Sequence, residues 1–173
     1  MKQSSNPSPA HTQGLADSAI DAAWAVLPPD ADLDASRLLP IVVGAHPRSE
    51  AADRPLGNRL VAAIRQWQRH AITEEADRLI PMVMTDLWFL NDQELLLQPA
   101  IAIGEPGTNA ASAYYGTRLP KAYVVDGSLQ VFADLEFLEP SVTLWGVDAS
   151  ATRTALDWFI SRHLGNFLES VHA

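Results

Sequence analysis

Residues 101–116, IAIGEPGTNAASAYYG, form the stretch that decides the fold. A short apolar run is followed by a turn rich in glycine and proline, and then by a segment that Thr108 or Asn109 can cap as a helix. This order is typical of a buried strand that passes through a tight turn into a helix. The stretch therefore predicts a strand over 100–104 and a helix from 109 to about 118.

The same order of strand, turn and helix recurs on both sides of this stretch. Such alternation predicts a mostly parallel sheet with helices on both of its faces. Pro81 lies within one of the predicted strands, and because proline lacks a backbone N–H, that strand is expected at a sheet edge or a bulge. The other predicted units are a strand over 41–43 with a helix from about Pro55, a strand within 79–89 with a short helix over 91–98, and a strand over 141–146 with a helix over 151–171 that Ser150 caps.

A hairpin interrupts this alternation between residues 121 and 135. Asp126 and Gly127 suit a tight turn that needs positive φ, and both flanking segments are rich in strand-forming residues. The hairpin adds an antiparallel part toward one edge of the sheet. The predicted fold class is α/β, with a mostly parallel open sheet in three layers, of the Rossmann-like or flavodoxin-like kind.

The N-terminal residues differ in composition from the rest. Residues 1–14 are rich in Ser, Pro, Gln and Asn, which predicts a disordered tail. Residues 15–27 have the apolar spacing of an extra N-terminal helix. At 173 residues, the chain suits a single α/β domain over 15–173 with its core in 40–173. The first residues lack the apolar segment of a signal peptide, so a cytoplasmic location is expected.

Composition excludes some functions and disfavours others. The chain contains no cysteine, which excludes disulfides, thiolate metal sites and cysteine nucleophiles. The formal net charge is −9, so the surface repels phosphate backbones and nucleic-acid binding is disfavoured. No apolar run is long enough to span a membrane. All but two of the 12 basic residues are arginine, the better residue for planar contacts with anions.

Glycine stands at or just past the end of three predicted strands, at Gly44, Gly104 and Gly146. Open α/β sheets bind ligands beyond the carboxyl ends of their strands, so a small polar ligand, nucleotide-like or carboxylate-bearing, is expected there. The alternative interpretation is that short turns between strands and helices need glycine for backbone reasons alone. The candidate ligand-binding residues are Arg48, Ser49, Gly104, Gly107, Thr108, Asn109 and Asp148.

The loop after residue 44 has the densest chemistry. His46 could act as an acid or base, and Glu50 as a base or nucleophile. Asp86 follows an apolar strand, where a carboxylate can have a raised pKa and a catalytic role. These three residues are the candidate catalytic groups; the alternative is a solvated loop and a backbone cap. No spacing typical of a metal site is present, and no cofactor is assigned.

The segment GEPGTNAASAYYGTR, residues 104–118, resembles the glycine-rich opening of the peptidyl-tRNA hydrolases, which reads Gly-Asn-Pro-Gly and later Thr-Arg-His-Asn. Here Glu105 replaces the asparagine, and Leu119 stands where the catalytic histidine would be. The stretch also lies in mid-chain. The resemblance therefore assigns no activity to this chain.

Two hypotheses about function follow. The first is a ligand-binding α/β domain; if it is a catalyst, hydrolysis or transfer would use Glu50 or Asp86 with His46. The second is a non-catalytic accessory subunit that binds a protein partner or a second copy of itself through the hairpin edge or the N-terminal helix. The sequence alone does not decide between them.

Overall fold

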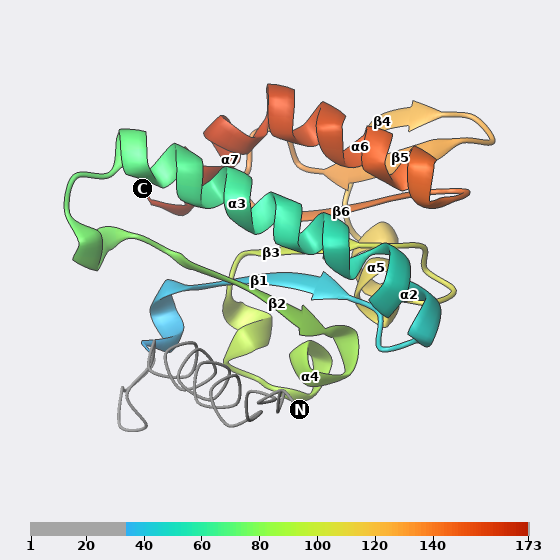
Figure 1. Cartoon of the computed structure of the whole chain (residues 1–173), viewed down its shortest axis with the longest axis horizontal. Helices are drawn as coiled ribbons and strands as arrows, with labels where there is room; N and C mark the ends of the chain where they lie inside the picture. The colour runs from blue at the N-terminus through green and yellow to red at the C-terminus, as the bar shows by residue number, and fades with distance from the viewer. Residues whose placement is uncertain (1–33, 173) are drawn as a thin grey trace, which may run out of the picture. The chain divides into compact units, whose positions relative to one another are not determined.

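The computed structural model describes residues 34–172. Its centre is one six-stranded sheet with the strand order β2-β1-β3-β6-β5-β4 (Figure 1). The first four strands in this order run parallel, and β5 is antiparallel to both of its neighbours. The strands are β1 (Leu38–Val43), β2 (Ile80–Thr85), β3 (Ala100–Ile103), β4 (Lys121–Val125), β5 (Leu129–Ala133) and β6 (Ser141–Gly146).

This topology confirms the predicted α/β class, with a mostly parallel sheet and an antiparallel hairpin at one edge. β2 is the other edge strand, as Pro81 predicted, and Pro81 pairs in register with Leu39 of β1. The order of the strands in the sheet differs from their order in the chain, and the direction of the strand order switches at β1. The chain passes from β1 outward to β2, and then returns across β1 to β3, which lies on its other side.

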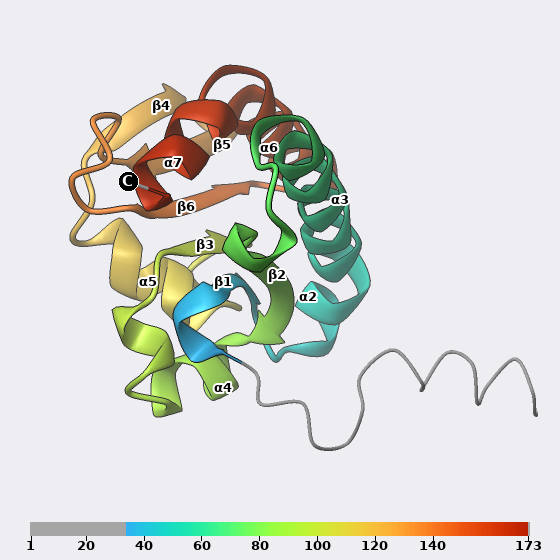
Figure 2. The same cartoon turned by 90° about the vertical axis from the view of Figure 1, so that its left-hand side faces the viewer.

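Helices cover both faces of the sheet (Figures 1 and 2). Helices α3, α6 and α7 lie on one face, and α4 and α5 lie on the other. The α-helices are α2 (Pro47–Ala52), α3 (Arg54–Ala71), α4 (Asp86–Asn91), α5 (Ala110–Gly116), α6 (Ala149–Arg162) and α7 (Leu164–Val171), and the 3-10 turns are η1 (Ala35–Arg37), η2 (Glu75–Asp77) and η3 (Leu95–Leu97).

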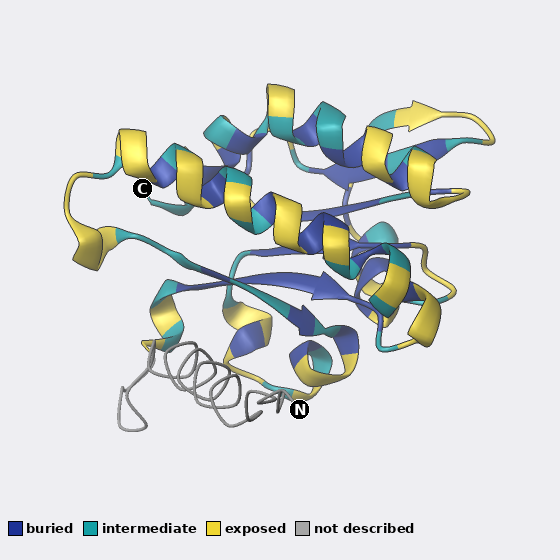
Figure 3. Cartoon of the chain, viewed as in Figure 1, coloured by how far each residue is buried: buried dark blue, intermediate teal, exposed yellow. Residues whose placement is uncertain are grey.

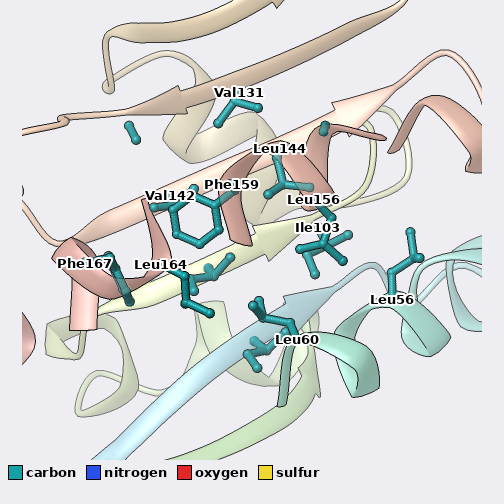
Figure 4. Packing of buried hydrophobic residues seen from close by; sticks show 14 of the residues in the cluster. Leu56, Leu60, Ile103, Val131, Val142, Leu144, Leu156, Phe159, Leu164 and Phe167 are labelled. Atoms are coloured by element: carbon teal, nitrogen blue, oxygen red, sulfur yellow. The ribbon is translucent and has the colours of Figure 1, made fainter. Parts of the chain in front are cut away.

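The core follows the alternation of side chains along the central strands, which are buried throughout (Figure 3). In β1, Ile41 and Val43 point into the cluster under α3, α6 and α7, whereas Val42 points into the cluster under α4 and α5. Leu60 of α3 and Phe159 of α6 belong to the first cluster and are fully buried (Figure 4). Strands buried on both faces read as continuous apolar runs, which is why the sequence signal was clear.

Several predicted elements differ from the structure. Residues 47–52, predicted as part of a loop, form α2, and the helix predicted over 91–98 is replaced by the end of α4 and the 3-10 turn η3. The strand within 79–89 ends at Thr85, whose hydroxyl accepts the backbone N–H of Trp88 and so begins α4 inside an apolar run. The helix over 151–171 is two helices, divided at His163. Its cap is Asp148 instead of Ser150, because the Asp148 carboxylate accepts the backbone N–H of Ala151 at 2.8 Å.

The disordered tail over 1–14 and the helix over 15–27 fall outside the described residues. Within the described part of the chain, no helix combines the length and the apolar character needed to cross a membrane.

Candidate functional site

A pocket of about 190 Å³ lies at the carboxyl ends of the parallel strands. All three loops that begin with glycine contribute to it. The geometry of open sheets predicted that these loops would emerge at this edge, and it left open whether they form one site. In Figure 1 this end of the sheet is marked by the tip of β1 and by α2. The lining residues are Arg48, Ser49, Ala52, Asp53, Glu105, Thr108, Gly146, Val147, Asp148, Ala149 and Thr152.

Two of the glycines allow the loops to meet. A Cβ atom at Gly44 would lie 1.8 Å from the carbonyl oxygen of Thr108, so only glycine lets the loops after β1 and β3 approach this closely. Gly104 has φ +114°, and a Cβ atom there would lie 2.6 Å from the carboxylate of Asp53. Both glycines therefore shape the pocket without offering side chains to a ligand.

Asp53 is the group in the pocket that sequence reasoning missed. It lies between α2 and α3 and is buried, with 7% of its surface exposed. Burial raises the pKa of the Asp53 carboxyl, and the charge of Glu105 raises it further. The Ser49 hydroxyl lies close enough to lower this pKa somewhat, although the two groups do not reach hydrogen-bond geometry. The available signal was an aspartate just before a proline-containing helix start, the usual place of a cap.

The charges that line the pocket are mainly negative. Asp53, Glu105 and Asp148 carry carboxylates, and Arg48 supplies the one guanidinium among the lining residues. Asp148 is committed to the first turn of α6, which places its charge at the positive end of that helix dipole. In the part of the chain that the structure describes, the carboxylates of Asp53 and Glu105 accept no backbone N–H group. A ligand in the pocket could therefore compensate the negative charges of these two carboxylates.

His46 and Glu50, two of the candidate catalytic residues, do not line this pocket. His46 is exposed and caps α2, with its Nδ1 accepting the backbone N–H of Arg48 at 3.1 Å. Glu50 forms an ion pair with Arg54, one turn further along the chain. The hydrogen bond from Arg54, 2.9 Å at its second contact, lowers the pKa of the Glu50 carboxyl.

Asp86, the third candidate catalytic residue, is 5% exposed and also lies outside the pocket lining. Its carboxylate accepts three backbone N–H groups: those of Ala45 and Leu87 at 2.8 and 2.9 Å, and that of Ala110 at 2.7 Å. These bonds tie the loop after β1 to the start of α5. The carboxylate thus holds the loops in place, and a catalytic role for it stays a prediction without support from these contacts.

The side chain of Asn109 also links backbone segments at this end of the sheet, those of β1, β3 and α5. Its side-chain amide donates to the carbonyls of Val42 and Ile103 at 3.0 and 2.9 Å, and its carbonyl oxygen caps α5. All of its bonding groups are therefore used inside the fold. Gly107 is exposed and lies outside the pocket lining. Of the predicted ligand-binding residues, the structure brings together Arg48, Ser49, Thr108 and Asp148.

Among residues 34–172, no group of three or more His, Asp or Glu side chains is placed to hold a metal ion. No family model matches the chain, and neither a curated protein nor a solved structure matches it. The site is therefore interpreted from its own geometry and charge.

Proposed function

We propose that this α/β domain binds a small polar ligand in the pocket at the carboxyl ends of β1, β3 and β6. The observation that carries the proposal is the convergence of three loops, far apart in sequence, around a hollow that contains the buried carboxyl of Asp53. A carboxyl with a raised pKa in a cleft is a recognised mark of a functional site. Its burial is costly unless a ligand or proton compensates the charge.

The size of the pocket limits the ligand. Its volume of about 190 Å³ is below the roughly 300–1,000 Å³ typical of sites for drug-sized molecules. A whole nucleotide therefore fits the pocket poorly, and a molecule of a few non-hydrogen atoms fits it better. Among the polar ligands expected from the sequence, the volume therefore favours molecules smaller than a nucleotide.

The charge of the lining indicates the chemistry of the ligand. An anionic group would face the carboxylates of Asp53 and Glu105 against a single guanidinium from Arg48. An amino group, or several hydroxyl groups, would instead donate hydrogen bonds to these carboxylates. We therefore favour a small amine or polyol over a phosphate or carboxylate ligand. The proposal is one of binding, because the groups expected to act as acid, base and nucleophile do not meet at the pocket.

A thermal-shift screen tests the proposal. Small amines, amino acids, polyols, phosphates and carboxylates are compared, and an amine or polyol is expected to raise the Tm in a saturable way. Asp53→Asn should weaken that shift, and the charge-matched control Glu169→Gln, an exposed residue on α7, should leave it unchanged. If no compound shifts the Tm, or if the Asp53 variant responds like the unaltered protein, the proposal fails.

The accessory-subunit hypothesis keeps support from one observation. β4 is the outermost strand of the hairpin and exposes Val124 and Val125. An edge strand with apolar side chains can pair with a strand of another molecule, including a second copy of this chain. Sedimentation measurements should then detect a dimer that Val124→Lys abolishes. Leu138→Lys, at a loop position that is 84% exposed, is the control that should preserve it.

A further inference from the structure

A second hollow, of about 320 Å³, lies at the opposite end of the sheet. It is formed where the chain enters β1 and β2 and where the C-terminal half of α3 passes above them. In Figure 1 this is the end at which α3 finishes, away from α2. Four arginines line it, together with a floor of Leu79, Ile80 and Pro81; these arginines are Arg37, Arg65, Arg69 and Arg78.

Two of these arginines are held in fixed positions by backbone carbonyl groups. The Arg37 guanidinium donates to the carbonyl of Arg78 at 3.0 and 2.8 Å and to that of Glu75 at 3.0 Å. The Arg78 guanidinium donates to the carbonyl of Ile72 at 3.3 and 3.1 Å. Because a carbonyl carries no net charge, these bonds orient the two guanidinium groups and leave their positive charges uncompensated.

The other two arginines project from α3, one helical turn apart. Arg65 and Arg69 are exposed, and like charges at this spacing repel each other. The ion pairs formed among residues 34–172 use Arg54 and Arg59, so none of the four arginines in the hollow has a carboxylate partner there. Of the two arginines on α3, Arg69 lies in the last turn, where the end of the helix dipole attracts a cation.

The hollow therefore carries a local excess of positive charge. Four arginines and one carboxylate, that of Glu75, line the hollow, which is a formal excess of three positive charges. The acidic residues Glu74 and Asp77 line a neighbouring hollow, which shares Arg37 and Leu79 with this one but none of the other three arginines. This concentration is unusual in a chain whose formal net charge is −9.

We propose that this hollow binds the phosphate group of a small phosphorylated molecule, or inorganic phosphate itself. Guanidinium groups match the oxygens of a phosphate with paired hydrogen bonds, and a phosphate dianion would compensate most of the local excess of charge. The apolar floor of Leu79, Ile80 and Pro81 can pack against the organic part of a phosphomonoester. A small ligand is favoured over nucleic acid, because the rest of this acidic surface repels a long polyanion.

The test is titration calorimetry with inorganic phosphate, glycerol phosphate and phenyl phosphate, with sodium chloride at matched ionic strength as the reference. Saturable binding of at least one phosphate compound is expected. The double variant Arg65→Gln with Arg69→Gln should weaken it by about tenfold or more, because it removes two guanidinium groups that hold no part of the fold. Arg153→Gln, an exposed arginine on α6, should bind as the unaltered protein does.

Inorganic phosphate and phosphomonoesters distinguish the two sources of the ligand. Tighter binding of phenyl phosphate than of inorganic phosphate would assign the apolar floor to the organic part, and equal binding would assign the site to phosphate alone. Backbone amide shifts in nitrogen-15 NMR should be largest near residues 65–69 and 78–81.

Three results would overturn the proposal: no effect beyond that of sodium chloride, unchanged binding by the double variant, or tighter binding of a short single-stranded oligonucleotide than of any small phosphate. The test is independent of the pocket at the carboxyl ends, because Asp53→Asn should leave phosphate binding unchanged.

Discussion

The two ends of the sheet carry opposite charge, and chain direction explains much of the contrast. At the carboxyl ends of the parallel strands, helices begin and their first N–H groups need acceptors, which Asp86 and Asp148 supply. At the amino ends, α3 and η2 have finished and carbonyl groups need donors, which Arg37 and Arg78 supply. Some of the charged side chains at each end of the sheet therefore serve to satisfy backbone groups of the fold.

At both ends of the sheet, some charged side chains form hydrogen bonds with backbone groups and others do not. Within residues 34–172, the side chains of Asp53 and Glu105 at one end, and of Arg65 and Arg69 at the other, form no hydrogen bond with a backbone group. A ligand can compensate the charges of these side chains, and both binding proposals rest on them. Substituting a charged residue that bonds the backbone should lower the stability, whereas substituting one that does not should leave it unchanged or raise it.

The largest effect is expected where the loops of the carboxyl end touch. Gly44→Ala places a methyl group 1.8 Å from the carbonyl oxygen of Thr108, which should cost more than about 3 kcal/mol of unfolding free energy. Gly107→Ala is the control, because nothing lies within 4 Å of the added carbon atom. Urea denaturation measures both. Equal stability of the two variants would show that the loops can separate freely.

The next largest effect concerns the carboxylate that serves the backbone. Asp86→Ala leaves the N–H groups of Ala45, Leu87 and Ala110 without their acceptor, which should cost about 2–3 kcal/mol of unfolding free energy. Arg37→Ala, its counterpart at the other end, removes half-buried bonds and should cost about 1 kcal/mol. Urea denaturation measures both losses of unfolding free energy. A larger loss for Arg37→Ala than for Asp86→Ala would contradict this prediction.

Asp53 should show the opposite sign, because its charge does not serve the backbone. Burial raises the pKa of its carboxyl above the ordinary value of 3.8, so the ionised form destabilises the fold. The cost is fully present above the raised folded-state pKa and vanishes below the unfolded-state value. Asp53→Asn should therefore raise the Tm at pH 7, and the difference should shrink as the pH falls toward 4. A constant difference across this range would exclude ionisation as the cause.

The smallest effect is expected on the helix surface. Arg65→Gln relieves the repulsion from Arg69 and should stabilise the protein without added anions by about 0.2–0.5 kcal/mol. Arg59→Gln is the control, because it removes the ion pair with Asp157 instead. With saturating phosphate, the order should reverse, since the unaltered protein binds the anion more tightly. Thermal melts at two phosphate concentrations measure both signs.

The sequence predicted the parts of the fold that local patterns control. The apolar runs around Ile41 and Ile101 became buried strands, the turn at Gly127 closed a hairpin, and Pro81 marked an edge strand. Strand order could not be read in this way, because the pairing of β3 with β6 joins segments separated by the whole hairpin. The break at His163 was also missed, because the apolar rows of α6 and α7 continue across it.

The site was predicted less completely for the same reason. The geometry of parallel sheets predicted which loops would emerge at this edge, and Arg48, Thr108 and Asp148 line the pocket there. Asp53 is buried where its carboxylate lies beside Gly104, a residue 51 positions further along the chain, so local sequence could not show this burial. The arginines of the second hollow come from three segments, and no local pattern marks their meeting.

Pro81 has a further consequence for assembly. It removes a backbone donor from β2, so that edge of the sheet cannot support a regular ladder with another strand. At the β4 edge, the register shifts between Lys121 and Tyr123, so the regular part of that edge is limited to residues 123–125. If two copies pair through the β4 edge, as proposed, the remaining free edge of each copy is β2, which Pro81 interrupts. Under that proposal, growth of the sheet by strand addition is expected to stop at a pair of copies.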